Sequence, residues 1–208
     1  MIPLETIVLF FAASVALGLS PGPDNIFVLT QSALYGRKAG ILVTLGLCTG
    51  LLAHTAAVSL GVAAIFQSSA LAFNFLKWIG ATYLVYLAAQ AFRAGPTNLD
   101  EDGNQDLSWQ QLYARGIIMN ITNPKVAIFF LAFLPQFADP ELGSLTIQIV
   151  VFGALFIIAT FIVFGGIAWF AGFLGDWLKR TAKAQIILNR VAGTIFVALA
   201  LRLAISER

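Results

Sequence analysis

The sequence predicts an all-α integral membrane protein in which six hydrophobic segments form a three-plus-three inverted repeat with broken first and fourth helices. Three observations lead to this fold class. Of the 208 residues, 59% are hydrophobic and only 11% are charged, whereas a soluble domain is about one quarter charged. Six apolar runs reach the roughly 20 residues that a helix needs to cross a bilayer. Proline and a charged residue interrupt two of these runs midway.

The order of the segments divides the chain into two halves. The six segments are expected over residues 4–34, 40–66, 70–92, 113–137, 144–172 and 186–205. A polar linker, 94–112, separates halves 1–93 and 113–208 of a single transmembrane domain that covers 1–208. Each half opens with a broken helix, and Pro23-Asp24 can be aligned with Pro124-Lys125. Matching interruptions in two halves of three segments are typical of an inverted repeat.

The basic residues predict the orientation in the membrane. If the six segments alternate, one side receives Arg37, Lys38, Arg93, Arg115, Lys179, Arg180, Lys183 and Arg190. Positively charged loops stay cytoplasmic, so the linker 94–112 is expected in the cytoplasm and both termini outside. If the first segment instead turns back at its prolines, the N-terminus is cytoplasmic. Residues 1–5 contain no Lys or Arg, so the first segment is not expected to be a cleaved signal peptide.

The two interruptions are the predicted substrate site. Their residues are Ser20, Pro21, Gly22, Pro23, Asp24 and Asn25 in the first, and Asn120, Asn123, Pro124 and Lys125 in the second. Proline removes a backbone donor and unwinds a helix, and unwound backbone persists in a membrane only where protein or water surrounds it. A helix start and Lys125 suit a carboxylate, while Asp24 suits an ammonium. Two other interpretations stay open: Asp24 and Lys125 neutralise each other as an ion pair, or Lys125 extends to the headgroups.

Two residues are candidates for proton coupling. Asp24 is the only acid well inside a predicted span, and His54 is the only histidine. Gly46, Gly50 and His54 follow one another at four-residue steps and therefore share one stripe of a helix. The two glycines predict close packing of another helix, with His54 in the seam. His54 is interpreted either as a proton or substrate group or as a hydrogen-bonded packing residue. The three asparagines are expected mainly to satisfy freed backbone groups.

Several function classes find no support in the residue pattern. An intramembrane enzyme would need a nucleophile–base pair, a carboxylate pair or a metal constellation, and no such set is evident. Cys48 is the only cysteine, so no cysteine-based metal or redox cluster is expected. No cofactor, no metal site and no nucleic-acid surface are predicted. A metal-ion exporter and a passive channel remain the alternatives to an amino-acid transporter, and a homodimer is retained as one candidate assembly.

Motifs spread over the whole chain resemble those of a known family. They are SPGPDN at 20–25, GRKAG at 36–40, GxxxGxxxH at 46–54, LKxxGAxYL at 76–84, NPK at 123–125 and FFLAFLPQF at 129–137. Together they resemble the LysE/RhtB superfamily of bacterial amino-acid exporters. The resemblance implies a multi-pass protein of the bacterial cytoplasmic (inner) membrane. Its implied partners are a small amino-acid-like substrate, protons and the lipid bilayer, with efflux driven by the proton-motive force.

Overall fold

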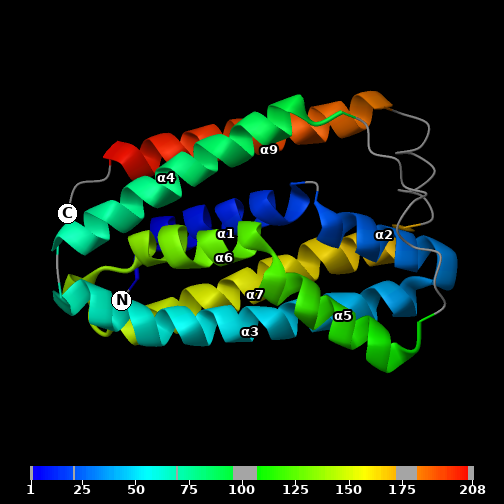
Figure 1. Cartoon of the computed structure of the whole chain (residues 1–208), viewed down its shortest axis with the longest axis horizontal. Coiled ribbons are helices and arrows are strands. Elements are labelled where there is room, and N and C mark those ends of the chain that lie inside the picture. The colour runs from blue at the N-terminus through cyan, green and yellow to red at the C-terminus, as the bar shows by residue number, and fades with distance from the viewer. Residues whose placement is uncertain (1, 21, 69, 96–106, 172–181, 206–208) are drawn as a thin grey trace.

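A computed structural model describes residues 2–20, 22–68, 70–95, 107–171 and 182–205 of the chain (Figure 1). Within these ranges the regular elements are helices and no strand occurs, so the all-α prediction is confirmed. Pro21 and the central part of the predicted linker, residues 96–106, lie outside the described residues.

The first and fourth predicted segments are both bent helix pairs. In the first, α1 (Leu4–Leu19) is followed by α2 (Pro23–Tyr35), at an angle of 65°. In the fourth, α5 (Trp109–Thr122) meets α6 (Pro124–Ile128), and the bend is 51°. A π-helical turn, η1 (Phe129–Phe133), and a 3₁₀ turn, η2 (Leu134–Phe137), complete the fourth segment. The interruptions read from the sequence therefore coincide with breaks in the helices.

The other segments are longer, unbroken helices. They are α3 (Arg37–Ser68), α4 (Ala70–Arg93), α7 (Leu145–Trp169) and α9 (Ala182–Ile205), with a short 3₁₀ turn, η3 (Pro140–Leu142), before α7. Helix α5 begins at Trp109, earlier than the predicted residue 113, because Ser108 and Gln111 form a capping box. The Gln111 amide donates to Ser108 Oγ, and the Ser108 amide donates to Gln111 Oε1. This start satisfies amides that an uncapped helix end would leave unpaired.

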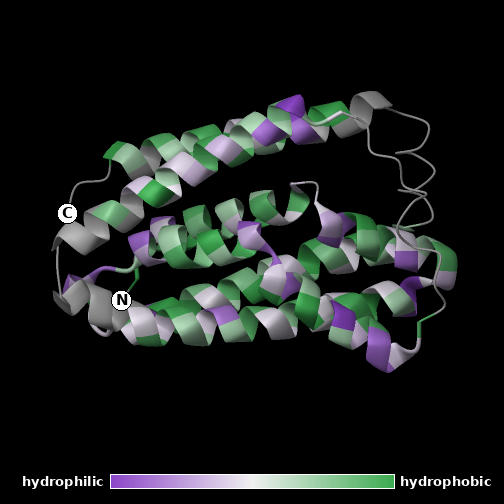
Figure 2. Ribbon diagram, in the orientation of Figure 1, coloured by the Kyte–Doolittle hydropathy of each residue, from purple (hydrophilic) through white to green (hydrophobic). Residues whose placement is uncertain are grey.

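Length and composition identify the membrane-capable helices. Among the described residues, Arg37–Gly61 within α3 and Leu145–Trp169 each suffice for a crossing, and each bent pair qualifies if it is counted as one span. The structure thus contains two to four such spans, and the six-segment arrangement stays a prediction. Figure 2 shows hydrophobic residues along the length of the helices. Many large apolar side chains are exposed, among them Leu60 at 78%, Ile147 at 66% and Leu201 at 62%. Apolar surface on this scale is expected to face lipid.

The helices pack as a central group and a peripheral pair. Helix α3 lies against α5 and α7, and α1 lies against α7, whereas α4 packs along α9 (Figure 1). An aromatic core fixes the segment after the second break. The Phe10 ring of α1 lies with its centroid 6.0 Å from that of Phe129, 5.1 Å from Phe137 and 4.8 Å from Phe152. This core links α1, the turns η1 and η2, and α7.

Helices α3 and α5 touch through their backbones. A Cβ atom added to Gly46 would lie 2.2 Å from the Tyr113 carbonyl oxygen and 2.9 Å from Gly116 Cα. At Gly50 the added atom would lie 2.7 Å from Asn120 Cβ. Only glycine permits these approaches, which places α5, and with it the second break, directly on α3.

The contact at Gly46 can be tested with Gly46→Ala. Because the obstructing atoms belong to the backbone of α5, the helices must separate, and we expect a loss of about 1–3 kcal/mol of stability. Thermal unfolding in detergent measures the change. Gly61→Ala, on the same helix with open space around it, is the matched control, and it should leave stability unchanged or slightly raised. Equal melting temperatures for the two variants would contradict the close contact.

Candidate functional site

At the first break, local hydrogen bonds stabilise the end of α1 and the start of α2. The Ser20 amide donates to the Ala16 carbonyl (3.0 Å), which closes α1. Gly22 is extended, and Pro23 occupies the first position of α2, where no amide donor is needed. The Asn25 side chain reaches back across the break and donates to the Gly18 carbonyl at 2.7 Å. Asn25 thus satisfies one of the carbonyls that the interruption frees.

The second break is organised around Asn123. This residue ends α5 and caps α6, and its amide donates to the Asn120 carbonyl at 3.1 Å. Its side-chain Oδ1 accepts a hydrogen bond from the Lys125 amide at 3.0 Å. Pro124 takes the first helical position, as Pro23 does in α2. Asn followed by Pro is a favourable helix start, which explains why α6 begins here.

Side chains of the second break bind the first break. Asn123 Nδ2 donates to Asp24 Oδ2 at 2.8 Å. Lys125 Nζ donates to the carbonyl oxygens of Ser20 at 3.0 Å and Leu17 at 3.3 Å. An ammonium suits the carbonyl end of α1, and a carboxylate suits the start of α2, because each opposes the local helix dipole. We call these three hydrogen bonds the break clasp.

The break clasp gives each of the two charges a hydrogen-bond partner in the other break. Asp24 is hydrogen-bonded to an asparagine, and no ion pair joins it directly to Lys125 among the described residues. The Lys125 ammonium is directed at the end of α1, not at the headgroups. The sequence analysis grouped Asp24, Asn123 and Lys125 in one site but did not predict that Asn123 bonds Asp24.

Both charged groups retain unused bonding capacity. Asp24 is only 5% exposed, and its Oδ1 has no hydrogen-bond partner within the described part of the chain. An ammonium has three donors, and the described hydrogen bonds of Lys125 use two of them. An unpaired buried polar atom costs about 1–3 kcal/mol, so its presence at this position suggests a site prepared for a ligand or a proton.

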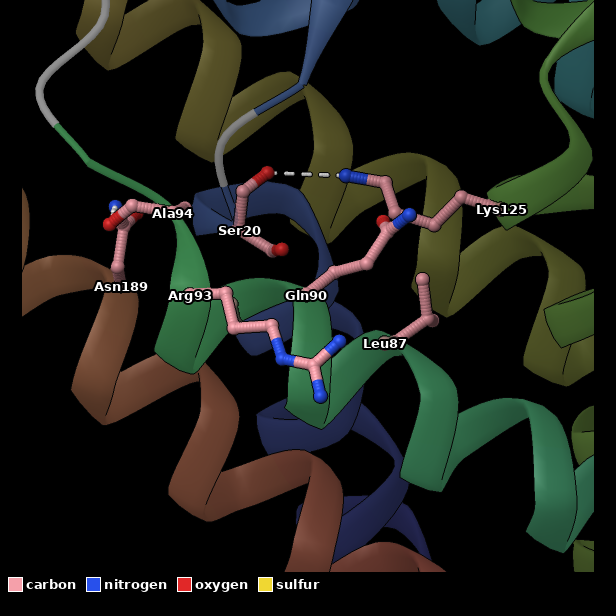
Figure 3. Close-up of a pocket in the computed structure, with 8 residues that line it drawn as sticks. Ser20, Leu87, Gln90, Arg93, Ala94, Lys125 and Asn189 are labelled. Atoms are coloured by element: carbon pink, nitrogen blue, oxygen red, sulfur yellow. Dashed lines mark hydrogen bonds between the residues drawn. The ribbon is translucent and has the colours of Figure 1, made fainter.

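A pocket of about 370 Å³ opens beside the breaks (Figure 3). It is lined by Ser20, Leu87, Gln90, Ala91, Arg93, Ala94, Lys125 and Asn189. These residues come from the end of α1, from α6, from α4 with the residue after it, and from α9. Two of these residues are cations and none is an acid, and Asp24 is not among them. The pocket therefore favours a ligand that carries a negative group.

The remaining predicted residues lie around the second break. His54 Nε2 lies 3.2 Å from the Asn120 carbonyl oxygen, and its ring centroid is 5.5 Å from that of Phe130. The tautomer with a proton on Nε2 makes this contact a hydrogen bond, since a carbonyl only accepts. Asn120 packs against Gly50, which places His54 next to the seam between α3 and α5. His54 is not among the residues that line the pocket.

Sequence reasoning missed the far wall of the pocket. Gln90, Arg93 and Asn189 line it from α4 and α9. Asn189 had a usable signal, because it is a polar residue inside the apolar run 186–205. Gln90 and Arg93 stand at the end of a predicted span, where polar residues are ordinary. In the described residues no group of three or more His, Cys, Asp or Glu could hold a metal ion.

Two bent helix pairs, whose breaks hold Asp24 and Lys125 next to a pocket, are typical of a membrane transport protein. The family model described as LysE type translocator matches residues 15–207, and the chain belongs to this family. Members of the family are transporters and not enzymes. The chain is accordingly an efflux transporter of a small molecule, resident in a membrane.

Relatives of similar length support this assignment. A homoserine/homoserine lactone efflux protein of Salmonella typhimurium is 35% identical over 188 residues, which is 90% of each chain. An uncharacterised membrane protein of Vibrio cholerae is 30% identical over 95% of this chain and 96% of its own length. An uncharacterised membrane protein of Bacillus subtilis is 24% identical over 98% of this chain and the whole of its own. No solved structure matches the chain.

The bond between Asn123 and Asp24 can be measured with a double-mutant cycle. Asn123→Ala and Asp24→Ala each remove one side of the bond, so their effects on stability should be non-additive by about 0.5–3 kcal/mol. Unfolding in detergent supplies the four free energies. The control cycle pairs Asp24→Ala with Thr122→Val, whose exposed hydroxyl bonds only within α5, and there we expect additivity. Additivity in both cycles would show that the breaks are not coupled through this bond.

Proposed function

We propose that the chain exports small amino acids or closely related metabolites from the bacterial cytoplasm in exchange for protons. The observation that carries the proposal is an incompletely bonded ammonium in the pocket together with an incompletely bonded carboxylate that Asn123 links to the same break. One group suits an anionic part of the substrate and the other suits a proton. A transporter that exchanges the two species needs both functions close together.

Lys125 is the proposed ligand of the substrate carboxylate. It lines the pocket, and its third donor remains available to an oxygen of the substrate. A charge-assisted hydrogen bond of this kind is roughly twice as strong as a neutral one. The Salmonella relative is named for both homoserine and its lactone, but the lactone lacks a free carboxylate. In this chain the cationic pocket supports the free amino acid as the better substrate.

Asp24 is the proposed proton carrier. Asn123 must present its amide nitrogen to Asp24 Oδ2, because its oxygen already accepts from the Lys125 amide. A proton on Asp24 therefore belongs on Oδ1, the oxygen without a partner. Protonation removes the negative charge beside Lys125 and weakens the acceptor facing Asn123, which loosens the break clasp. His54, bonded to the second break, is the other protonatable group near this path.

The arrangement of helices supports an inverted repeat that crosses the membrane six times. Exchanging the two halves replaces the contact of α1 with α7 by that of α5 with α3, and both occur. The same exchange leaves the pairs α3–α7 and α4–α9 unchanged, as a two-fold axis in the membrane plane requires. Figure 1 shows α2 continuing beyond α1 along the long axis of the molecule, which suits a broken span better than a re-entrant loop.

Asp24→Asn tests the proton role directly. The variant keeps an oxygen for Asn123 to donate to, so folding should survive, but it cannot take up a proton. In proteoliposomes with a pH gradient, amino-acid export should fall to the level of vesicles without protein, while exchange without a gradient persists. Glu5→Gln, an exposed acid on α1, is the control. Export by Asp24→Asn that still follows the gradient would exclude Asp24 as the carrier.

Lys125→Ala tests the carboxylate site. The loss of a hydrogen bond to a charged group, about 1.5–3 kcal/mol, should weaken substrate affinity about 10- to 100-fold. An amino-acid methyl ester, which lacks the carboxylate charge, should bind the wild type and the variant equally. Lys38→Ala removes an exposed lysine at the start of α3 and serves as the control. Intact affinity combined with lost detergent stability would assign Lys125 a structural role only. Vesicles loaded with divalent metals instead of amino acids test the competing class of exporter.

A further inference from the structure

The residues that line the pocket differ in exposure, and this difference shows where the pocket opens. Gln90, Arg93 and Ala94, in and just after the last turn of α4, are exposed. Lys125 is half-buried, and Ser20 is only 6% exposed. The end of α4 therefore forms the mouth of the pocket, and the break clasp lies deeper.

Arg93 supplies the charge at this mouth. Among the described residues it has no hydrogen bond or ion pair, and a guanidinium offers five donors and keeps its charge. Apart from Lys125, the other side-chain donors of the wall are neutral. The Ser20 hydroxyl belongs to a buried residue, and the Gln90 and Asn189 amides already donate within the protein. A carboxylate that enters at the mouth therefore meets Arg93 first.

The two cations of the pocket suit successive contacts with one carboxylate. Figure 3 shows them on different walls, Arg93 on α4 and Lys125 on α6. An exposed charge binds an anion only weakly because water competes for both groups, whereas Lys125 is half-buried and keeps one donor free. Weak binding at the mouth and stronger binding inside allow a substrate to pass inward. We propose that Arg93 is the entry residue, which binds the substrate carboxylate at the mouth before Lys125 does.

The proposed orientation places this mouth on the side from which an exporter takes up its substrate. Arg93 is one of the basic residues that predict the cytoplasmic face. The described acids Asp139 and Glu141 precede α7, at the opposite end of the proposed spans. A zwitterionic amino acid in the cytoplasm would thus enter with its carboxylate first and its ammonium behind, which is the orientation that Lys125 requires.

This inference rests on the proposed function, and its test separates the two. Everted bacterial membrane vesicles with the full-length protein expose its cytoplasmic face, so export of labelled homoserine is measured as uptake. At an ionic strength of about 10 mM, Arg93→Gln should raise the KM about two- to fivefold, the range expected for an exposed charge pair, and leave kcat unchanged. Near 1 M, where the Debye length is about 3 Å, the difference should shrink.

Three controls separate a contact with the substrate from a structural role. Arg93→Lys retains the charge and should restore most of the wild-type KM. Lys38→Gln removes an exposed cation that does not line the pocket, and it should leave the KM unchanged. Homoserine methyl ester lacks the carboxylate charge, so its KM should not rise in Arg93→Gln. In the wild type alone, added salt should raise the KM of homoserine and not that of the ester.

The outcomes distinguish the entry role from the proposed function. An unchanged KM for homoserine in Arg93→Gln, or an equal rise in Lys38→Gln or with the ester, would overturn the role of Arg93. Poor membrane insertion cannot imitate the expected result, because KM does not depend on the amount of protein. If Arg93→Gln fails to insert at all, a wild-type KM for homoserine that does not respond to salt overturns the role. A wild type that takes up no amino acid would instead overturn the proposed function.

Discussion

The break clasp is the interaction on which the rest of the site depends. A helix interrupted in apolar surroundings exposes carbonyls at one end and amides at the next, and each unpaired group is costly. Here Lys125 donates to two carbonyls at the end of α1, and Asn123 donates to the Asp24 carboxylate at the start of α2. Because one break completes the other, neither can change its conformation alone. In the proposed mechanism, this dependence couples a proton on Asp24 to a substrate at Lys125.

The surrounding packing determines which parts can move. Backbone contacts at Gly46 and Gly116 hold α5 rigidly on α3, and aromatic rings hold η1 and η2 on α1 and α7. Helices α4 and α9 pack chiefly on each other and form the opposite wall of the pocket. The arrangement is one of a firm central group and a peripheral pair, with the ligand space between them. Motion of the pair relative to the breaks would change access without disturbing the apolar core.

Much of this site could be predicted from the sequence, for a physical reason. A proline or a charged residue inside an apolar run raises the free energy of a membrane helix wherever it occurs. Residues 20–25 and 120–125 can therefore be recognised from the sequence alone. Their partners do not stand out, because a hydrogen bond such as Asn123 to Asp24 depends on how two distant segments meet. The same holds for Asn189, which lines a pocket assembled by four segments. The π-helical turn η1 left no signal, since FFLAF is equally suited to an α-helix.

Because the break clasp joins the two halves of the chain, it also affects the order in which hydrogen bonds can form during synthesis. Synthesis proceeds from the N-terminus, so α1 and α2 exist before Asn123 and Lys125 have been joined to the chain. Until then the carboxylate of Asp24 and the carbonyls of Leu17 and Ser20 have no counterpart from the second half. The first half therefore reaches its final hydrogen bonding only after the second break has been synthesised.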